Sequence, residues 1–407
     1  MEYIAFFIEI NKMSFMPREV IIAAAKRTPI GSYMGSLSKI PAVNLGASCI
    51  KAAIQQANIK PSDIQEVMLG NMFGGLGQAP ARQASIYAGL PYETICTGIN
   101  KACSSGMKSV TLAAQSITLG HVDVIMAGGI ENMSLAPFYI ADYRPGHLYA
   151  DSTIFNLLST DGVYCKHSKL TMGLCSEKTI EKYGITREEQ DSFCAESYRR
   201  AEKAWKRGFF NNEIVPIEVQ GKGGNVTVTE DDEYKKVKYD KIPTLKPVFD
   251  KNGTITAANA SGFNDGGSTA LVMSIDAARK LGVKPLARIV SFADGETEPM
   301  HFGTAPTPSI QMALKRAKMT VNNVDLWEIN ENFSSIAIVN MKLLGISHDK
   351  LNINGGAVAL GHPFAMSGCR IIATLINSLR ESNKTIGCAS ICNGGGGATS
   401  IIIELIN

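Results

Sequence analysis

Apolar and polar positions alternate along the chain with two different periods. Between 107 and 117, apolar residues recur at the three- and four-residue spacing of a helix, and a short apolar run at 122–129 follows Gly120. The same succession returns at 371–379 and 386–396. Short runs that are apolar on both faces are typical of strands buried between helices. The pattern predicts an α/β fold in which helices cover parallel strands.

The chain also repeats itself. ANIKPSDIQEVMLGNMF at 57–73 resembles AKMTVNNVDLWEINENF at 317–333, since in both a helix end precedes a polar turn, an apolar strand and a phenylalanine. The first copy is followed by KACSSGMKSV at 101–110 and the second, at similar spacing, by GHPFAMSGCR at 361–370. This repetition predicts two α/β halves related by duplication.

A more polar and less periodic segment separates the two halves. It spans 138–245 and contains a charged stretch at Arg187–Lys206 that is expected to be helical. We interpret it as a loop domain. Long insertions of this kind are often functional. The halves then comprise 17–137 with 246–283, and 284–407.

Composition narrows the class of protein. The 407 residues are 45% hydrophobic and 19% charged, with a net charge of +3 and both signs interspersed. This balance gives no reason to expect a nucleic-acid or membrane partner, and no apolar run approaches the ~18 residues of a membrane span. Nine cysteines without a CxxC pair indicate reduced thiols rather than disulfides or a zinc site.

The two ends of the chain do not settle its location. Residues 1–16 are apolar but carry Glu2 and Glu9, with Lys12 as their only base, whereas transit peptides are Arg-rich and acid-poor. The C-terminal IELIN is not a peroxisomal address of the SKL type. Targeting therefore stays open.

Two residues at equivalent places in the repeat are candidates for chemistry. Cys103 precedes a helix, where free amides and the helix dipole are expected to favour the thiolate, although a lone cysteine is more often simply buried. His362, in Leu-Gly-His-Pro, could activate a thiol or be a structural histidine. Because the duplication relates their positions, we expect the two to face each other.

The second half adds further candidates. Cys392 ends an apolar strand before Asn393 and the glycines 394–397, whose amides could face an oxyanion, cradle a phosphate or form a tight turn. Asn330 ends another strand and can reach the same crevice.

Four of these segments resemble the signature segments of the thiolase family, in the same order over residues 17–407. They are Cys-Ser-Ser-Gly at 103–106, Asn-Glu at 330–331, Gly-His-Pro at 361–363 and Cys-Asn-Gly-Gly-Gly at 392–396. The likeness is greatest to mitochondrial acetoacetyl-CoA thiolases, through GTITAANASGFNDG, INGGAVALGHP and ASICNGGGG. The resemblance implies an α/β fold of thiolase-like duplicated halves, with helices layered around two mixed sheets and a loop domain covering the CoA site.

The resemblance also implies a reaction. Cys103 would take an acyl group from a CoA thioester with His362 as its base, and Cys392 would move a proton on the α-carbon of a second acyl-CoA. The resulting enolate would attack the acyl-cysteine, and the reverse reaction would cleave a 3-oxoacyl-CoA. His362 and a water held by Asn330 would stabilise one oxyanion, and the amides of Cys103 and Gly394 the other. This is an acetyl-CoA C-acetyltransferase activity of fatty acid, ketone body or isoleucine metabolism.

Ligand contacts follow from the same resemblance. Those implied for CoA are Tyr198, Lys236, Lys241, Ser261 and Met172. Those implied for a potassium ion are Tyr198, Ala257, Ala258, Ala260 and Val358. Phe302 would lie beside the acyl pocket and tolerate a 2-methyl branch, unless it is ordinary core. No redox cofactor is expected. The group implies a homotetramer, a dimer of dimers, in mitochondria, with the cytoplasm as the alternative.

Several positions depart from the family. Thr171 stands in place of a histidine, Asn332 in place of an alanine, and Phe364-Ala365 follow Gly-His-Pro. These departures make pantetheine contacts and acyl selectivity the least certain transfers. The alternatives are a 3-ketoacyl-CoA thiolase for longer chains, a decarboxylating condensing enzyme, which Cys392 argues against, and a non-catalytic lipid-carrier protein of the same fold.

Overall fold

The computed structural model describes residues 18–406, except Asp142, Pro145, His147, Leu148, Ala150 and Lys222. Residues 1–16, on which targeting depends, lie outside this part. Ten strands of the described chain form one mixed sheet, in the order β14-β15-β16-β13-β1-β12-β5-β3-β4, with β2 paired to β12.

Each half of the chain contributes one side of this sheet. The strands of the first half are β1 (Val20–Arg27), β2 (Gly31–Ser32), β3 (Glu66–Gly70), β4 (Ile95–Ile99), β5 (Val124–Asn132) and β12 (Asn264–Ser274), and its helices are α2 (Ala42–Ala57), α3 (Pro80–Tyr87), α4 (Ser105–Thr118) and α7 (Ile275–Leu281). The second half supplies β13 (Ala287–Glu296), β14 (Leu326–Ile329), β15 (Ile386–Asn393) and β16 (Gly397–Leu405), with α8 (Pro306–Ala317), α9 (Ser334–Leu344), α10 (Ala357–Leu360) and α11 (Phe364–Glu381).

The mixed character and the helical layers agree with the resemblance, but two details differ from expectation. The two sheets are continuous, because β1 pairs with β13 at Ile21 and Ile22. The sheet is also not parallel throughout, since only β3 with β4 and β5, and β14 with β15, run parallel. The tight glycine turn between β15 and β16 forces an antiparallel pair.

The predicted duplication is visible in local geometry. A left-handed residue ends the helix in each copy, Asn58 with φ 53° and Lys318 with φ 55°. In the turn that follows, the amide of Lys60 donates to Asp63 at 2.8 Å and the amide of Thr320 donates to Asn323 at 2.8 Å. The same helix, turn and strand are therefore built twice with similar capping.

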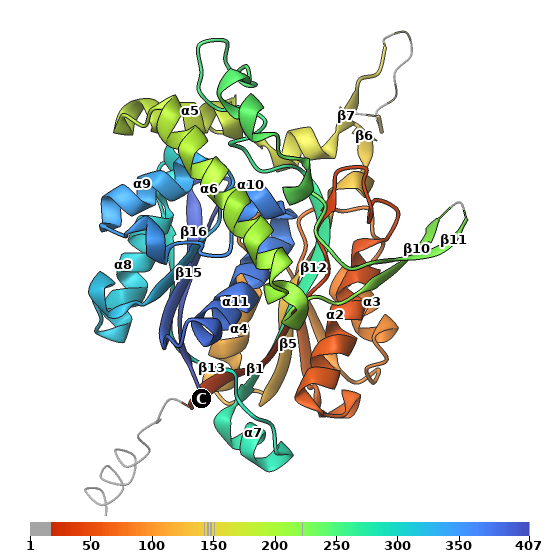
Figure 1. Ribbon diagram of the computed structural model, residues 1–407. Helices are drawn as coiled ribbons and strands as arrows, with labels where there is room; N and C mark the ends of the chain where they lie inside the picture. Colours follow the sequence, from red (N-terminus) through yellow and green to blue (C-terminus); the bar gives the residue numbers. More distant parts are fainter. Residues whose placement is uncertain are drawn as a thin grey trace, which may run out of the picture.

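The two central helices, α4 and α11, bring the halves together. Figure 1 shows them side by side between the strands of the two halves, while α2 and α3 cover one outer face and α8 and α9 the other. The helices approach closely at Gly106, where a Cβ would lie 2.4 Å from the carbonyl oxygen of Ala365. Since Cys103 and His362 immediately precede these helices, the contact places both near one seam.

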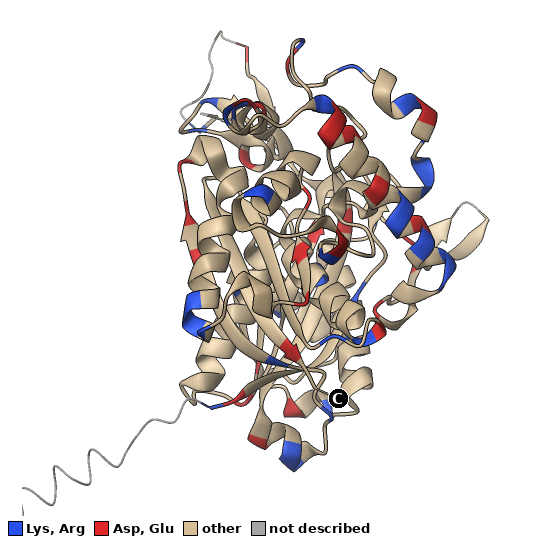
Figure 2. Ribbon diagram, turned by 60° about the vertical axis from the view of Figure 1, so that its left-hand side comes forward, with Lys and Arg blue, Asp and Glu red and all other residues tan. Residues whose placement is uncertain are grey.

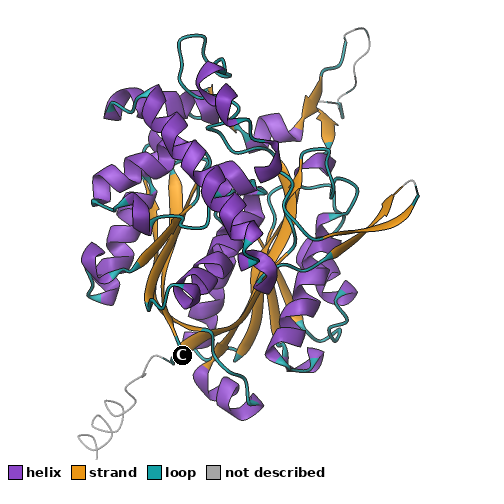
Figure 3. Ribbon diagram, in the orientation of Figure 1, coloured by secondary structure: helices purple, strands orange, loops and turns teal. Residues whose placement is uncertain are grey.

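The segment between the halves holds short strands and two longer helices. They are β6 (Phe138–Ile140), β7 (Ile154–Asn156), β8 (Tyr164–Cys165), β9 (Leu170–Thr171), α5 (Met172–Tyr183), α6 (Arg187–Lys206), β10 (Ile217–Gly221) and β11 (Gly224–Val228). The helix predicted at Arg187–Lys206 is confirmed with the same bounds. The ribbons β6–β7 and β10–β11 project from the body (Figure 3).

Charged residues of both signs are interspersed over the outer elements (Figure 2). Within the described chain, no helix is long and apolar enough to cross a bilayer.

Candidate active site

The first element of the site is the turn that carries Cys103. Ala102 has φ 45°, so the chain reverses there before α4 begins at Ser105. The hydroxyl of Ser104 donates to the carbonyl oxygen of Ile391 at 3.0 Å and to Oδ1 of Asn393 at 2.8 Å. These bonds tie the turn of the first half to strand β15 of the second. Cys103 itself is only 6% exposed.

The second element is the turn that carries His362. Gly361 has φ 107°, and a Cβ there would lie 2.7 Å from Asn264. The amide of His362 donates to Oδ1 of Asn264 at 2.8 Å. Its Nδ1 lies 2.7 Å from Oγ of Ser367, whose hydroxyl donates to the carbonyl oxygen of Pro363 at 2.8 Å. Ser367 therefore accepts from Nδ1–H, which leaves Nε2 as the basic nitrogen.

The third element is the segment after β14. Asn330, Glu331 and Asn332 leave the strand, and the buried carboxylate of Glu331 fixes the segment. It accepts from Ser197 of α6 at 2.8 Å, from Asn352 at 2.7 Å and from the amide of Val358 at 3.2 Å. The segment is thereby joined both to the insertion and to α10.

Asn332 connects the functional groups. Its Nδ2 lies 3.0 Å from Nε2 of His362, and its Oδ1 accepts from Sγ of Cys392 at 3.3 Å and from Nδ2 of Asn330 at 2.9 Å. Sequence reasoning noted Asn332 only as a departure from the family. An amide two residues after Asn330, where the family has alanine, was the signal that could have identified it.

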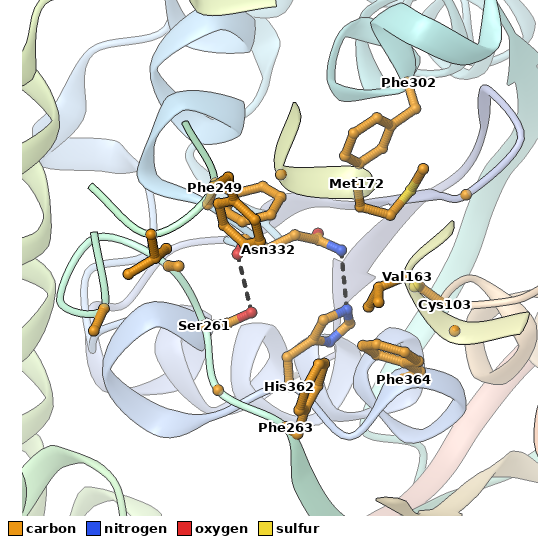
Figure 4. Close-up of a pocket in the computed structure, with 18 residues that line it drawn as sticks. Cys103, Val163, Met172, Phe249, Ser261, Phe263, Phe302, Asn332, His362 and Phe364 are labelled. Atoms are coloured by element: carbon orange, nitrogen blue, oxygen red, sulfur yellow. Dashed lines mark hydrogen bonds between the residues drawn. The ribbon is translucent and has the colours of Figure 1, made fainter. Parts of the chain in front are cut away.

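These elements surround one cavity of about 410 Å³. Figure 4 shows Cys103, Asn332 and His362 around the same space, with Phe302 and Phe364 among its apolar walls. Cys392, in contact with Asn332, is fully buried and is not part of the lining, and Asn330 is likewise buried. The lining residues are Cys103, Gly162, Val163, Met172, Gly173, Val248, Phe249, Ala257, Ala260, Ser261, Gly262, Phe263, Phe302, Asn332, Phe333, His362, Phe364 and Gly394.

Burial dominates the protonation of the Cys103 thiol. It raises the pKa of Cys103 to about 12, against the opposing hydrogen bond from the amide of Gly394. The expectation of a stabilised thiolate is therefore wrong for the free enzyme. Cys103 lies outside the first turn of α4, and desolvation outweighs the effect of nearby amides.

The other two groups are also held neutral. Burial, with a smaller contribution from the charge of Arg370, lowers the pKa of His362 to about 3, so its imidazole is an unprotonated base at neutral pH. Burial also raises the pKa of Cys392 well above its usual range. The arrangement pairs two neutral thiols with a neutral base, which suits proton transfer during a reaction rather than a preformed ion pair.

Comparison with known proteins shows the family of the chain. The family model for the thiolase N-terminal domain matches residues 20–276, and that for the thiolase C-terminal domain matches residues 283–405. The chain belongs to the thiolase family. It is 51% identical to a probable acetyl-CoA acetyltransferase of Dictyostelium discoideum, covering 95% of this chain and 94% of that protein. It is 47% identical to the human mitochondrial acetyl-CoA acetyltransferase, covering 95% and 90%.

Solved thiolases share the fold. The crystal structure of a thiolase from Ascaris suum in complex with coenzyme A superimposes with a TM-score of 0.90 at 40% identity, covering 96% of this chain and all of that one. The human mitochondrial 3-ketoacyl-CoA thiolase gives 0.93 at 35% identity, covering 96% of this chain and 100% of that one.

The CoA contacts predicted for this thiolase lie in three kinds of place. Ser261 and Met172 line the cavity. Tyr198 is buried elsewhere, in an apolar cluster of α6 and α10. The side chains of Lys236 and Lys241 are 55% and 64% exposed, pair with neighbouring carboxylates and do not line the cavity.

The positions predicted for potassium in this thiolase are likewise divided. Tyr198, Ala258 and Val358 belong to the cluster of α6 and α10, whereas Ala257 and Ala260 line the cavity. The carboxylate of Glu331, which accepts from the amide of Val358, places a buried acid at this junction. Carbonyl oxygens suit a weakly hydrated cation, and potassium at these positions stays a prediction.

The departures from the family have distinct structural consequences. Thr171 caps α5, its hydroxyl accepting from the amide of Leu174 at 3.4 Å, and it does not line the cavity. Phe364 does line it, with its ring centroid 5.1 Å from that of His362. The ring of Phe364 therefore adds apolar surface beside the base.

Proposed function

We propose that this thiolase is an acetyl-CoA C-acetyltransferase that joins two acyl-CoA molecules to a 3-oxoacyl-CoA and free CoA, reversibly and through an acyl group on Cys103. The observation that carries the proposal is that Cys103, His362 and Gly394 line one apolar cavity. Cys392 contacts this group through Asn332. The activity in the names of the relatives supports the same reaction.

The first half-reaction transfers the acyl group. Nε2 of His362 takes the proton of the Cys103 thiol while Sγ of Cys103 bonds to the thioester carbon. The amides of Cys103 and Gly394 stabilise the negative oxygen. The bond from carbon to the CoA sulfur then breaks, and the leaving sulfur takes the proton of Cys392.

The second half-reaction forms the carbon–carbon bond. The Cys392 thiolate, formed when it protonated CoA, removes an α-proton from the second acyl-CoA. The enolate carbon attacks the acyl-cysteine, the sulfur of Cys103 leaves, and it regains its proton from His362. Every proton taken up in one step is returned in another, so the enzyme ends in its starting state.

Acyl specificity is the finer part of the proposal. Phe302 is buried and lines the cavity, which suits a small acyl group with or without a 2-methyl branch. The similarity to a 3-ketoacyl-CoA thiolase keeps a longer-chain substrate as the second candidate. A non-catalytic lipid carrier is the third. Cleavage rates for acetoacetyl-CoA and for a longer 3-oxoacyl-CoA separate the three.

We further propose how ligands and subunits are arranged. Segment 138–245 is the loop domain over the CoA site, with 17–137 plus 246–283 and 284–407 as the halves. Tyr198, Lys236, Lys241, Ser261 and Met172 contact CoA. Potassium is held by Tyr198 and by carbonyls of Ala257, Ala258, Ala260 and Val358, where its charge would order the loop beside the substrate.

An oligomer and a compartment belong to the same proposal. The ribbon β6–β7 projects with exposed Phe138, Ile140 and Ile154, which suits burial in a homotetramer, and equilibrium sedimentation that finds only monomer would contradict this. The mitochondrial names of the relatives support a mitochondrial location, with the cytoplasm as the alternative that cell fractionation tests.

The test is thiolytic cleavage of acetoacetyl-CoA and of 2-methylacetoacetyl-CoA with free CoA, at several potassium concentrations. We expect both substrates to be cleaved, potassium to help, and Cys103→Ala to be inactive. Cys96→Ala, which alters a cysteine outside the cavity, is the matched control and should retain activity. Cleavage of neither substrate would contradict the proposed function.

A further inference from the structure

We infer that the side-chain amide of Asn332 is itself an oxyanion donor of the second half-reaction. It takes the place of the water that the family resemblance assigns to Asn330. This inference rests on the proposed function, because it assigns a role within that reaction. It concerns a residue that the family resemblance did not assign.

The contact to Asn330 shows which place the Asn332 amide occupies. A water held by Asn330 would accept a hydrogen bond from its Nδ2 and donate onward to the substrate oxygen. Here Nδ2 of Asn330 donates at 2.9 Å to Oδ1 of Asn332, and the same nitrogen also lies 3.4 Å from Nδ1 of His362. Nδ2 of Asn332 then lies beside Nε2 of His362, and Asn332 lines the cavity. The amide thus provides the same acceptor and donor as the water.

Both the backbone and the side chain of Asn332 are held in place. The backbone carbonyl oxygen of Asn332 accepts from the amide and the hydroxyl of Ser261, both at 3.0 Å (Figure 4). Oδ1 of its side chain accepts from Asn330 and from Cys392. A donor that is fixed before the reaction does not have to reorganise when charge develops, which is the property that makes oxyanion donors effective.

The hydrogen-bonding role of Nε2 of His362 in its contact with Asn332 changes during the reaction. In the free enzyme, Nδ2–H of Asn332 donates to the unprotonated Nε2 at 3.0 Å. Nε2 has one lone pair, so this bond is released when Nε2 takes the proton of Cys103, and both nitrogens are then donors. An enolate oxygen placed within about 3 Å of both accepts from each of them. The same pair therefore becomes an oxyanion hole once Nε2 is protonated.

The two half-reactions allow a specific test. Acetylation of Cys103 by acetyl-CoA uses the amides of Cys103 and Gly394, whereas single-turnover cleavage of acetoacetyl-CoA also requires the enolate site. In Asn332→Leu, which keeps the size but removes the donor and leaves no room for water, cleavage should fall about 10²–10³-fold. Acetylation, followed by intact mass and CoA release, should fall far less.

Asn332→Ala is the matched variant, since it leaves space for a water on Asn330. We expect it to cleave acetoacetyl-CoA faster than Asn332→Leu does. An Asn332→Leu enzyme that cleaves at the wild-type rate, or loses both half-reactions in equal proportion, would overturn the inference. An Asn332→Ala enzyme no faster than the leucine variant would overturn the replacement of water. If the wild type is not acetylated at all, the proposed function fails instead.

Discussion

The turns that carry Cys103 and His362 are related by the duplication, yet they prepare opposite chemistry. In both, a residue with positive φ, Ala102 or Gly361, comes directly before the functional residue and a central helix begins shortly after it. Both functional side chains are buried. The thiol lies beside the backbone amides of Cys103 and Gly394, whereas the imidazole is held by side chains from two separate segments, Asn332 after β14 and Ser367 in α11.

The comparison teaches that burial and partners have separate effects. Burial raises the pKa of the thiol and lowers that of the imidazole, so it removes charge from both sides of the pseudo-symmetric seam. The hydrogen-bond partners then decide which group gives up a proton and which accepts it. Ser367 and Asn332 leave Nε2 of His362 as an acceptor, while the amide of Gly394 can stabilise negative charge near Cys103. A symmetric frame thus holds an acid and a base without an ion pair.

Removing the base should break the comparison most strongly. His362→Ala leaves no group to take the proton of the buried Cys103 thiol, so acetylation should fall about 10²–10⁴-fold. The measurement is single-turnover CoA release. His121→Ala, which removes an exposed histidine near the end of α4, is the control and should leave the rate unchanged. Acetylation of the His362 variant at the wild-type rate would assign the base elsewhere.

Separate substitutions of the two residues with positive φ, Gly361 and Ala102, should sharpen the comparison. Gly361→Ala meets Asn264 and forces a positive φ, so we expect about 2–4 kcal/mol of destabilisation in denaturant unfolding. Ala102→Gly relieves a left-handed alanine and should change stability by less than about 1 kcal/mol. Equal effects of both variants would show that the two turns are not differently constrained.

The smallest expected effect concerns the wall of the pocket. Phe302→Ala removes apolar contact that a 2-methyl branch would make, so the ratio of branched to unbranched thiolysis should fall about tenfold. The ratio is measured with both substrates on the same enzyme sample. If both rates fall equally and the melting temperature drops, Phe302 is a core residue without a role in selection.

Much of this frame was predictable from sequence because it depends on periodicity and repetition. The repeat at 57–73 and 317–333 predicted the two polar turns, and the charged stretch at Arg187–Lys206 was expected to form the helix that is α6. The continuous sheet was not predictable, since it depends on two tertiary pairs at β1 and β13. Nor was the raised pKa of Cys103, because a sequence pattern shows the adjoining helix but not the depth of burial.

The site shows the same limit. The convergence of Cys103 and His362 on one cavity followed from the duplication. The bridging position of Asn332 depends on side-chain directions in an irregular segment, which no period encodes. The catalytic roles of Cys103, His362, Cys392, Asn330 and Gly394 stay predictions that rest on resemblance and geometry.

The pH dependence of Cys103 acetylation tests the central claim most directly. The assay uses saturating acetyl-CoA, so that ionisation of the CoA phosphates, which affects binding, does not change the measured rate. The Cys103 thiol, with a pKa of about 12, and the His362 imidazole, with a pKa of about 3, both stay neutral. The single-turnover rate should therefore be flat between about pH 5 and pH 8. A rate that falls as the pH is lowered, with a midpoint near the ordinary histidine value of 6.5, would contradict the account.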